Sequence, residues 1–208
     1  MRVIALEAAT VRAEVAFLDE ASGQAYRRAF DAPGSLAERL FVGIRELERE
    51  AWPASRAELV VAAGGPGSFT GLRVTAAAAK GLAFVTGARF KGVSSLAALA
   101  AEGPAGVLIA AVLDARGGDF YYGLYERRGE DVRTVRPPAV AGPEDLAAAG
   151  AELFVGPWAA PGPVPGVPWR EVWPAAAVLG RLGARAVRTS GPDDLTTFRP
   201  LYLKRGQV

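Results

Sequence analysis

The chain has 208 residues, half of them hydrophobic, which is enough to bury a core in one large domain or two small ones. It contains no histidine and no cysteine. This excludes Ser-His-Asp catalysis, a thiolate nucleophile, disulfides and the commonest transition-metal ligands. The formal net charge is only +2 and no Lys/Arg cluster stands out, so the sequence gives little support to autonomous nucleic-acid binding.

The first elements in chain order are three strand-like segments, which predict an antiparallel meander over residues 2–7, 12–18 and 24–30. A helix is expected to follow, because Ser35 and Glu38 have the spacing of a capping box. Apolar residues then recur at helical spacing, and Pro53 predicts that the helix ends before it.

Residues 58–63 form an apolar run typical of a parallel strand that is covered on both faces. A glycine-rich loop at 64–71 and an Ala-rich helix up to residue 86 follow, and 94–101 predict one more short helix. The first half therefore contains three strands, a helix, a strand and two helices.

The pattern restarts after Gly103-Pro104, which sets the predicted boundary between a domain at 1–103 and a smaller one at 104–208. The expected elements of the second half are strands at 107–113, 119–127, 131–135 and 152–155, and helices at 143–149 and 174–187. Residues 157–174 are rich in proline and predict an extended connection, with a proline-rich ligand for a recognition domain as a minor alternative. Two βββαβα passes predict a duplicated α/β fold with a cleft between its halves.

The most distinctive segment is the glycine-rich loop between a buried strand and the start of a helix. Its backbone amides and the helix dipole could hold an anion, although the Gly-Lys-Ser/Thr ending of a Walker A loop is missing. The alternative is a tight strand-to-helix turn capped by Ser68 or Thr70. The sequence leaves both interpretations open for Gly65, Pro66, Gly67, Ser68, Phe69, Thr70, Gly71 and Arg73.

Two carboxylates end equivalent strands of the predicted halves. Glu7 closes the first strand and Asp114 closes the strand that opens the second half, so both could face a cleft and hold Mg²⁺ through water. The alternative is that each is a solvated strand-end residue. Ala8 and Ala9 supply no phosphate-binding glycine or hydroxyl, which leaves Thr10 as the remaining candidate.

Two predicted helices, 36–50 and 71–86, have more apolar surface than packing on one sheet requires. A helix that is apolar on all sides is either buried on all sides or covered by another chain. We therefore expect a partner interface on these helices, at Leu36, Leu40, Phe41, Ile44, Val74, Ala77, Ala78, Gly81 and Leu82. The alternative is that both helices pack only on their own sheet. The interface hypothesis predicts that Ile44→Glu or Ala78→Glu abolishes association while the monomer stays folded.

Four segments resemble the TsaB (YeaZ) family over the whole chain. GGPGSFTGLRVTAAAAKGLA resembles the family signature, LDARGGDFYYGLYE its second-domain motif, VIALEAAT its opening strand and RPLYLKR its C-terminal tail. The resemblance implies the duplicated fold of actin, sugar kinases and Hsp70, in agreement with the two passes above. The chain departs from the family at Glu7, where Asp is usual, and at Ala8 and Ala9, where hydroxyl residues are common.

The resemblance also implies a function. Family members are bacterial subunits that pair with the homologous catalytic protein TsaD and with the small ATPase TsaE to make threonylcarbamoyladenosine beside the tRNA anticodon. In this sequence Glu7 interrupts the first apolar stretch and no signal peptide is visible, so we expect a cytoplasmic location. TsaD-like proteins have a His-x-x-x-His metal pair, which the corresponding segment SLAERLFVGIREL lacks. We therefore expect a homodimer when the chain is alone, contact with tRNA only through the complex, no membrane association and no cofactor, except an adenine nucleotide at the partner interface.

Three alternative functions stay open. A small-molecule kinase of the same fold needs an Asp-based phosphate loop, which the EAAT segment does not provide. A peptidase, a label the family has sometimes carried, would need a Ser/Lys, Thr-based or carboxylate site, and the sequence shows no such constellation. The third is a purely structural homodimer with no role in tRNA modification.

Overall fold

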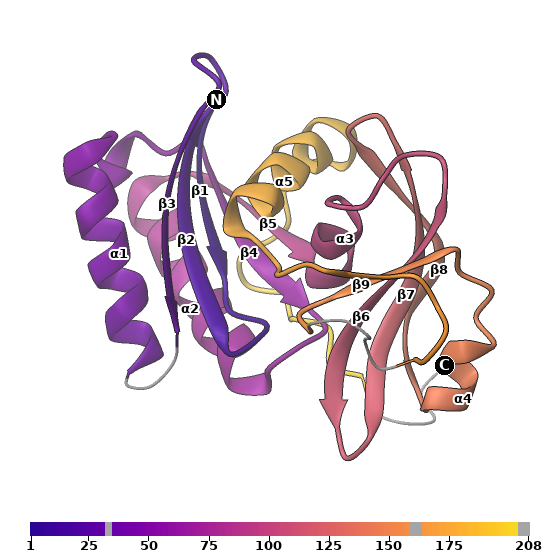
Figure 1. Cartoon of the computed structure of the whole chain (residues 1–208). Helices are drawn as coiled ribbons and strands as arrows, with labels where there is room; N and C mark the ends of the chain where they lie inside the picture. Colours follow the sequence, from indigo (N-terminus) through magenta and orange to yellow (C-terminus); the bar gives the residue numbers. More distant parts are fainter. Residues whose placement is uncertain (32–34, 159–163, 204–208) are drawn as a thin grey trace.

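The computed structural model describes residues 1–31, 35–158 and 164–203. It contains two five-stranded sheets that lie side by side with helices between them and on their outer faces (Figure 1). The strand orders are β3-β2-β1-β4-β5 and β8-β7-β6-β9-β10. Each strand of the first half therefore has a counterpart at the same place in the second sheet, which confirms the predicted duplicated α/β fold.

The first sheet combines an antiparallel meander with two parallel strands. β1 (Arg2–Glu7), β2 (Arg12–Asp19) and β3 (Gln24–Asp31) form the meander. β4 (Leu59–Gly65) then pairs in parallel with β1, and β5 (Arg89–Ser94) pairs in parallel with β4. The three meander strands lie where the sequence predicted them, over residues 2–7, 12–18 and 24–30. β5 was missed, because the charged and glycine residues of its sequence hide the strand pattern.

Two helices cover the outer face of the first sheet. α1 (Leu36–Glu50) begins at the predicted cap, where the Ser35 hydroxyl accepts the Glu38 N–H at 3.3 Å, and ends before Pro53. A short 3₁₀ helix (Ala54–Arg56) and then α2 (Phe69–Thr86) complete this layer. The layer and the sheet share one hydrophobic core, which includes Ile4, Leu6, Val15, Phe17, Leu40, Ile44, Leu47, Ala78, Ala79 and Ala83.

The second sheet repeats this plan with reduced helices. It consists of β6 (Leu108–Arg116), β7 (Asp119–Arg128), β8 (Asp131–Ala141), β9 (Leu153–Gly156) and β10 (Trp169–Glu171), with the short helix α4 (Pro143–Ala147) before β9. β10 was not expected, since it lies in the proline-rich stretch. It pairs in parallel with β9, and residues 159–163 of that stretch lie outside the described residues.

One helix follows the last strand of each half, and each of these two helices packs against the sheet of the other half. α3 (Ser95–Ala100) follows β5 but packs its Leu96 and Leu99 against the second sheet. α5 (Ala176–Ser190) follows β10 but packs Leu179 and Ala184 against the first sheet. The predicted boundary at residue 103 thus separates the sheets, whereas each half contributes a helix to the core of the other.

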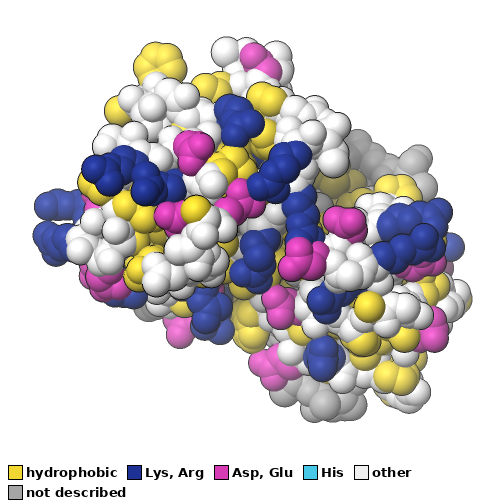
Figure 2. Space-filling model, turned by 90° about the horizontal axis from the view of Figure 1, so that it is seen from above, with side chains coloured by type: hydrophobic (Ala, Val, Ile, Leu, Met, Phe, Trp, Pro, Cys, Tyr) yellow, Lys and Arg dark blue, Asp and Glu magenta, His cyan; other side chains and the backbone are white. Residues whose placement is uncertain are grey.

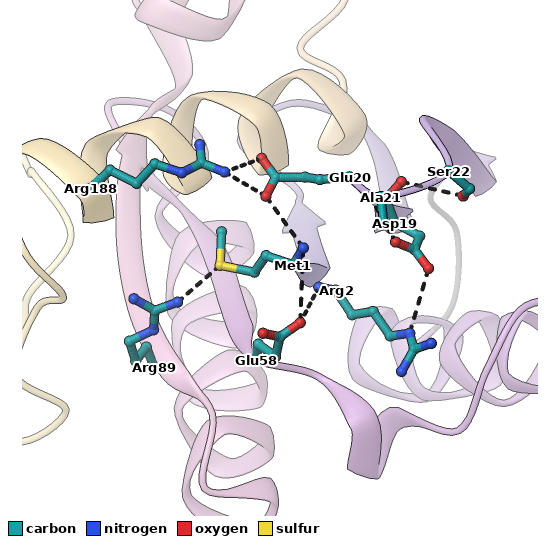
Figure 3. A network of polar contacts seen from close by, with 9 residues as sticks. All are labelled: Met1, Arg2, Asp19, Glu20, Ala21, Ser22, Glu58, Arg89 and Arg188. Atoms are coloured by element: carbon teal, nitrogen blue, oxygen red, sulfur yellow. Dashed lines mark hydrogen bonds and ion pairs between the residues drawn. The ribbon is translucent and has the colours of Figure 1, made fainter.

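A polar network attaches the end of α5 to the first sheet (Figure 3). Arg188 of α5 donates two hydrogen bonds to the Glu20 carboxylate at 2.6 and 2.7 Å, and the amino group of Met1 lies 3.6 Å from the same carboxylate.

Across the described residues, no helix is both long and apolar enough to span a bilayer.

Candidate functional site

The glycine-rich loop is packed against the turn between β1 and β2. A Cβ atom at Gly71 would lie 1.8 Å from the carbonyl oxygen of Ala8, and one at Gly67 would lie 2.6 Å from that of Ala9. The Ser68 N–H donates to the Ala9 carbonyl at 2.7 Å. The glycines are therefore needed for close approach of one backbone to another, and the chain itself fills the space in front of them.

The other side of the loop is held by the C-terminal segment. The Leu201 N–H donates to the Gly64 carbonyl at 2.8 Å. The ring of Tyr202 lies 5.2 Å from that of Phe69, and the Arg73 guanidinium lies 3.7 Å from the centre of the Phe69 ring. These contacts support the interpretation of the loop as a structural turn, with the Ser68 hydroxyl capping α2 by accepting the Gly71 N–H at 3.2 Å.

Glu7 is fully buried below this turn. Its Oε1 accepts the Ala9 N–H at 2.5 Å, and its Oε2 has no hydrogen-bond partner among the described residues. The pKa of Glu7 is raised to about 8, chiefly by burial; the hydrogen bond from the Ala9 N–H lowers it, and the charge of Glu14, its cross-strand neighbour, adds to the rise. Glu7 therefore orders the β1–β2 turn and does not face the cleft, which argues against the water-mediated Mg²⁺ site considered above.

The cleft between the halves has a volume of about 410 Å³ and brings together residues from both. Thr10, Ser68 and Thr70 line it from the first half and Asp114 and its neighbours from the second, whereas Glu7 does not line it. Val11, Leu36, Leu113, Trp158 and Trp173 make much of the rest of its wall. In the described parts of the chain, no three Asp or Glu side chains are grouped as metal ligands.

Asp114 shapes the hairpin of the second sheet. It is exposed, and its Oδ1 accepts the Arg116 N–H at 2.7 Å. Arg116 has a positive φ of 68°, a backbone conformation that residues other than glycine rarely adopt. This hydrogen bond indicates that Asp114 holds the turn between β6 and β7.

The predicted partner interface is only partly at the surface. Leu40, Ile44 and Ala78 are buried in the core of their own half, and Leu36, Val74 and Leu82 pack at its edge. The hypothesis that these residues contact a partner is wrong for the three buried ones, because helical periodicity cannot tell an outer apolar face from the face on the sheet. The predicted residues with exposed positions are Phe41, Ala77 and Gly81.

Large apolar side chains that the sequence analysis did not place in the partner interface are exposed on the same helices. Phe84 and Val85 of α2 are about four-fifths exposed, at 80% and 81%, and Phe69 at its start is 53% exposed. Val42 of α1 is exposed to the same extent as Phe41. Positions 69, 73, 77, 81 and 85 recur every four residues, so they form one stripe along α2.

Together, the duplicated sheets and the cleft between them define a protein with a duplicated, actin-like α/β fold, in which the β1–β2 turn lies against a glycine-rich loop. Residues 35–157 match the family TsaD: tRNA N6-adenosine threonylcarbamoyltransferase. A crystal structure described as a protein with similarity to peptidase YeaZ from Pseudomonas aeruginosa superimposes with a TM-score of 0.85 and 30% identity, covering 98% of this chain and 99% of that one.

One further comparison concerns the family and another the fold alone. The tRNA threonylcarbamoyladenosine biosynthesis protein TsaB of Bacillus subtilis is 42% identical over 79 residues, a match that spans 38% of this chain and 34% of that protein. The polyphosphate/ATP-glucomannokinase of Arthrobacter sp. shares the fold alone, with a TM-score of 0.52 at 11% identity over 90% of this chain and 98% of that one. The chain belongs to the TsaB (YeaZ) family.

Proposed function

We propose that this chain is a non-catalytic subunit that binds a TsaD-type protein and supports the formation of threonylcarbamoyladenosine on tRNA. The observation that carries this proposal is the packing of the β1–β2 turn into the glycine-rich loop. Main-chain atoms of Ala8 and Ala9 lie where a Cβ of Gly71 or Gly67 would be, and the only carboxylate of the turn, Glu7, is buried. The family match and the absence of His and Cys from the chain add support.

The partner surface that we propose is the exposed stripe of α2, defined as Phe69, Arg73, Ala77, Gly81, Phe84 and Val85. Exposed aromatic and branched apolar side chains are typical of interaction sites. The small residues Ala77 and Gly81 lie in the middle of the stripe, and a Cβ added at Gly81 would meet no atom of this chain. A helix of another chain can therefore approach α2 closely at this point.

α1 adds to this surface. It packs against α2, and its Phe41 and Val42 are each 48% exposed. We propose that the same surface forms the homodimer of the isolated chain and the complex with the TsaD-type protein, so that the two associations exclude each other. The TsaE-type ATPase, indirect contact with tRNA, location in the cytoplasm and an adenine nucleotide at the partner interface belong to the same proposal.

Association tests this surface directly. Phe84→Glu places a charge at an exposed apolar position, where an interface would have to desolvate it without a partner. We expect the variant to fold as the wild type does and to bind a TsaD-type protein at least ~10-fold more weakly, measured by calorimetry and light scattering. Val135→Glu is the matched control, because Val135 is also exposed but lies on β8 of the second sheet.

The outcome that contradicts the proposed surface is a folded Phe84→Glu variant with unchanged affinity for the partner. Ile44→Glu, by contrast, is now expected to unfold the monomer, because Ile44 is only 4% exposed within the core of the first half. No observation on the described residues favours the kinase or the peptidase over this proposal.

A further inference from the structure

A second and larger cavity, of about 750 Å³, lies on the α5 side of the first sheet. Four arginines from four different elements line it: Arg12 of β2, Arg27 of β3, Arg170 of β10 and Arg181 of α5. They are far apart in the sequence, which explains why no basic cluster was visible there. The exchange of α5 between the halves brings them together.

Among the described residues, these four guanidinium groups form no close ion pair. In the described ranges, no carboxylate lies within 4.0 Å of any of them, although Arg170 donates a hydrogen bond to a main-chain carbonyl. The last turns of α5 differ, since Arg185 pairs with Glu130 and Arg188 with Glu20. Figure 2, which shows the molecule from above, shows Lys and Arg side chains interspersed with Asp and Glu side chains on this face.

Three carboxylates also line the cavity, but two of them are engaged or buried. Glu171 accepts the indole N–H of Trp173 at 3.0 Å. Glu14 is only 6% exposed, and this burial raises its pKa. Arg27, the amides at the start of α5 and Arg12 lower the pKa of Glu14, but burial has the larger effect. The third, Glu102, is exposed and forms no ion pair among the residues described. The cavity keeps an excess of positive charge because its four arginines outnumber its three carboxylates, and the raised pKa of Glu14 weakens the opposing charge.

We propose that this cavity binds the phosphate groups of a nucleotide. The planar guanidinium fork matches the oxygens of a phosphate, and several arginines that converge on one space suit a group with more than one negative charge. The volume lies within the range of small-molecule sites. Trp173 in the cavity wall offers an aromatic surface for a base. Free nucleotides and the nucleotides of an RNA strand share this chemistry.

This inference goes beyond the proposed function, which requires only a protein partner. Its test uses the isolated full chain, so its result does not depend on binding of a TsaD-type protein. The probes are a fluorescein-labelled single-stranded RNA of about 12 nucleotides, followed by anisotropy, and unlabelled ATP and pyrophosphate, followed by calorimetry and as competitors. We expect binding that weakens as salt rises.

The variants are chosen to keep the fold. Arg27→Gln, Arg181→Gln and their combination remove positive charge at exposed side chains, and the double variant is expected to lose ~10-fold or more in affinity and to show a smaller salt slope. Glu14→Gln removes an opposing charge and is expected to raise affinity. The control is Arg45→Gln with Arg56→Gln, which makes the same charge change on the outer layer of the first sheet.

The outcomes separate the sources of the phosphate. Displacement of the RNA by ATP or pyrophosphate identifies a free nucleotide as the ligand, whereas RNA binding that resists millimolar ATP identifies an RNA strand. The proposal is overturned if neither RNA nor ATP binds at about 1 mM. It is equally overturned if the Arg27 and Arg181 variants bind as the wild type does, or if the control loses as much affinity as they do.

Discussion

The contact between Gly71 and the β1–β2 turn predicts a large effect for the smallest substitution in the glycine-rich loop. In Gly71→Ala the new Cβ would lie 1.8 Å from the Ala8 carbonyl oxygen, whereas ordinary contact begins at 3.4 Å, so the backbones must separate by roughly 1.6 Å. The turn cannot move freely, because Ala9 is bound by both Glu7 and Ser68. We expect a loss of about 3 kcal/mol in the free energy of unfolding, at the upper end of the range for overpacked sites.

Urea denaturation followed by circular dichroism measures this loss, which corresponds to a fall in Tm of about 6–12 °C for a chain of this size. Gly81→Ala is the matched control on the same helix, because a Cβ there meets no atom of the chain. Replacing a glycine inside a helix by alanine at an open position is expected to stabilise by about 0.5–1 kcal/mol. If Gly71→Ala were as stable as the wild type, the loop would not be filled by the turn.

Two further predictions concern single side chains. The pKa of Glu7 is raised from 4.5 to about 8, chiefly by burial, so between these values the folded chain holds a proton that the unfolded chain has lost. The free energy of unfolding therefore falls as pH rises from 5 to 8. Glu7→Gln is expected to make this fall less steep, by up to about 1.4 kcal/mol per pH unit, as measured by denaturation at several pH values. An unchanged dependence of the unfolding free energy on pH would contradict the burial of Glu7. Arg116→Gly is expected to stabilise the folded chain by about 1 kcal/mol, because glycine adopts the positive φ of this position without strain. Asp114→Ala is expected to destabilise it by a similar amount, because the Arg116 N–H loses its acceptor. Thermal melts in which the two variants change stability in the opposite directions would refute this account of the hairpin.

The sequence predicted the order of most elements because their signals are local. Short strand-like segments identify β1 to β3, and the Ser35 cap and Pro53 bracket α1. The exchange of α3 and α5 between the halves was not predictable in this way. It depends on which apolar faces meet in three dimensions, and the sequence alone does not specify that pairing. β5 and β10 were missed because charged residues, glycine and proline mask their short patterns.

The candidate sites show the same limit. The sequence presented the glycine-rich loop as either an anion site or a turn, and the choice depends on Ala8 and Ala9, which are about 60 residues away along the chain. The four arginines of the larger cavity come from positions 12 to 181, so composition could not reveal them. The exposure of Phe84 could have been suspected only from its position on α2, which is rotated away from the buried Ala79 and Ala83.

The central claim, that this chain supports a TsaD-type protein through α2, is tested most directly by tRNA modification in a purified system. The measurement is the amount of threonylcarbamoyladenosine formed by the TsaD-type protein with its other components, with this chain omitted or supplied as wild type, Phe84→Glu or Val135→Glu. We expect modification with the wild type and with Val135→Glu, and little or none with Phe84→Glu or without the chain. Equal modification in the absence of the chain, or with the Phe84→Glu variant, would contradict the claim.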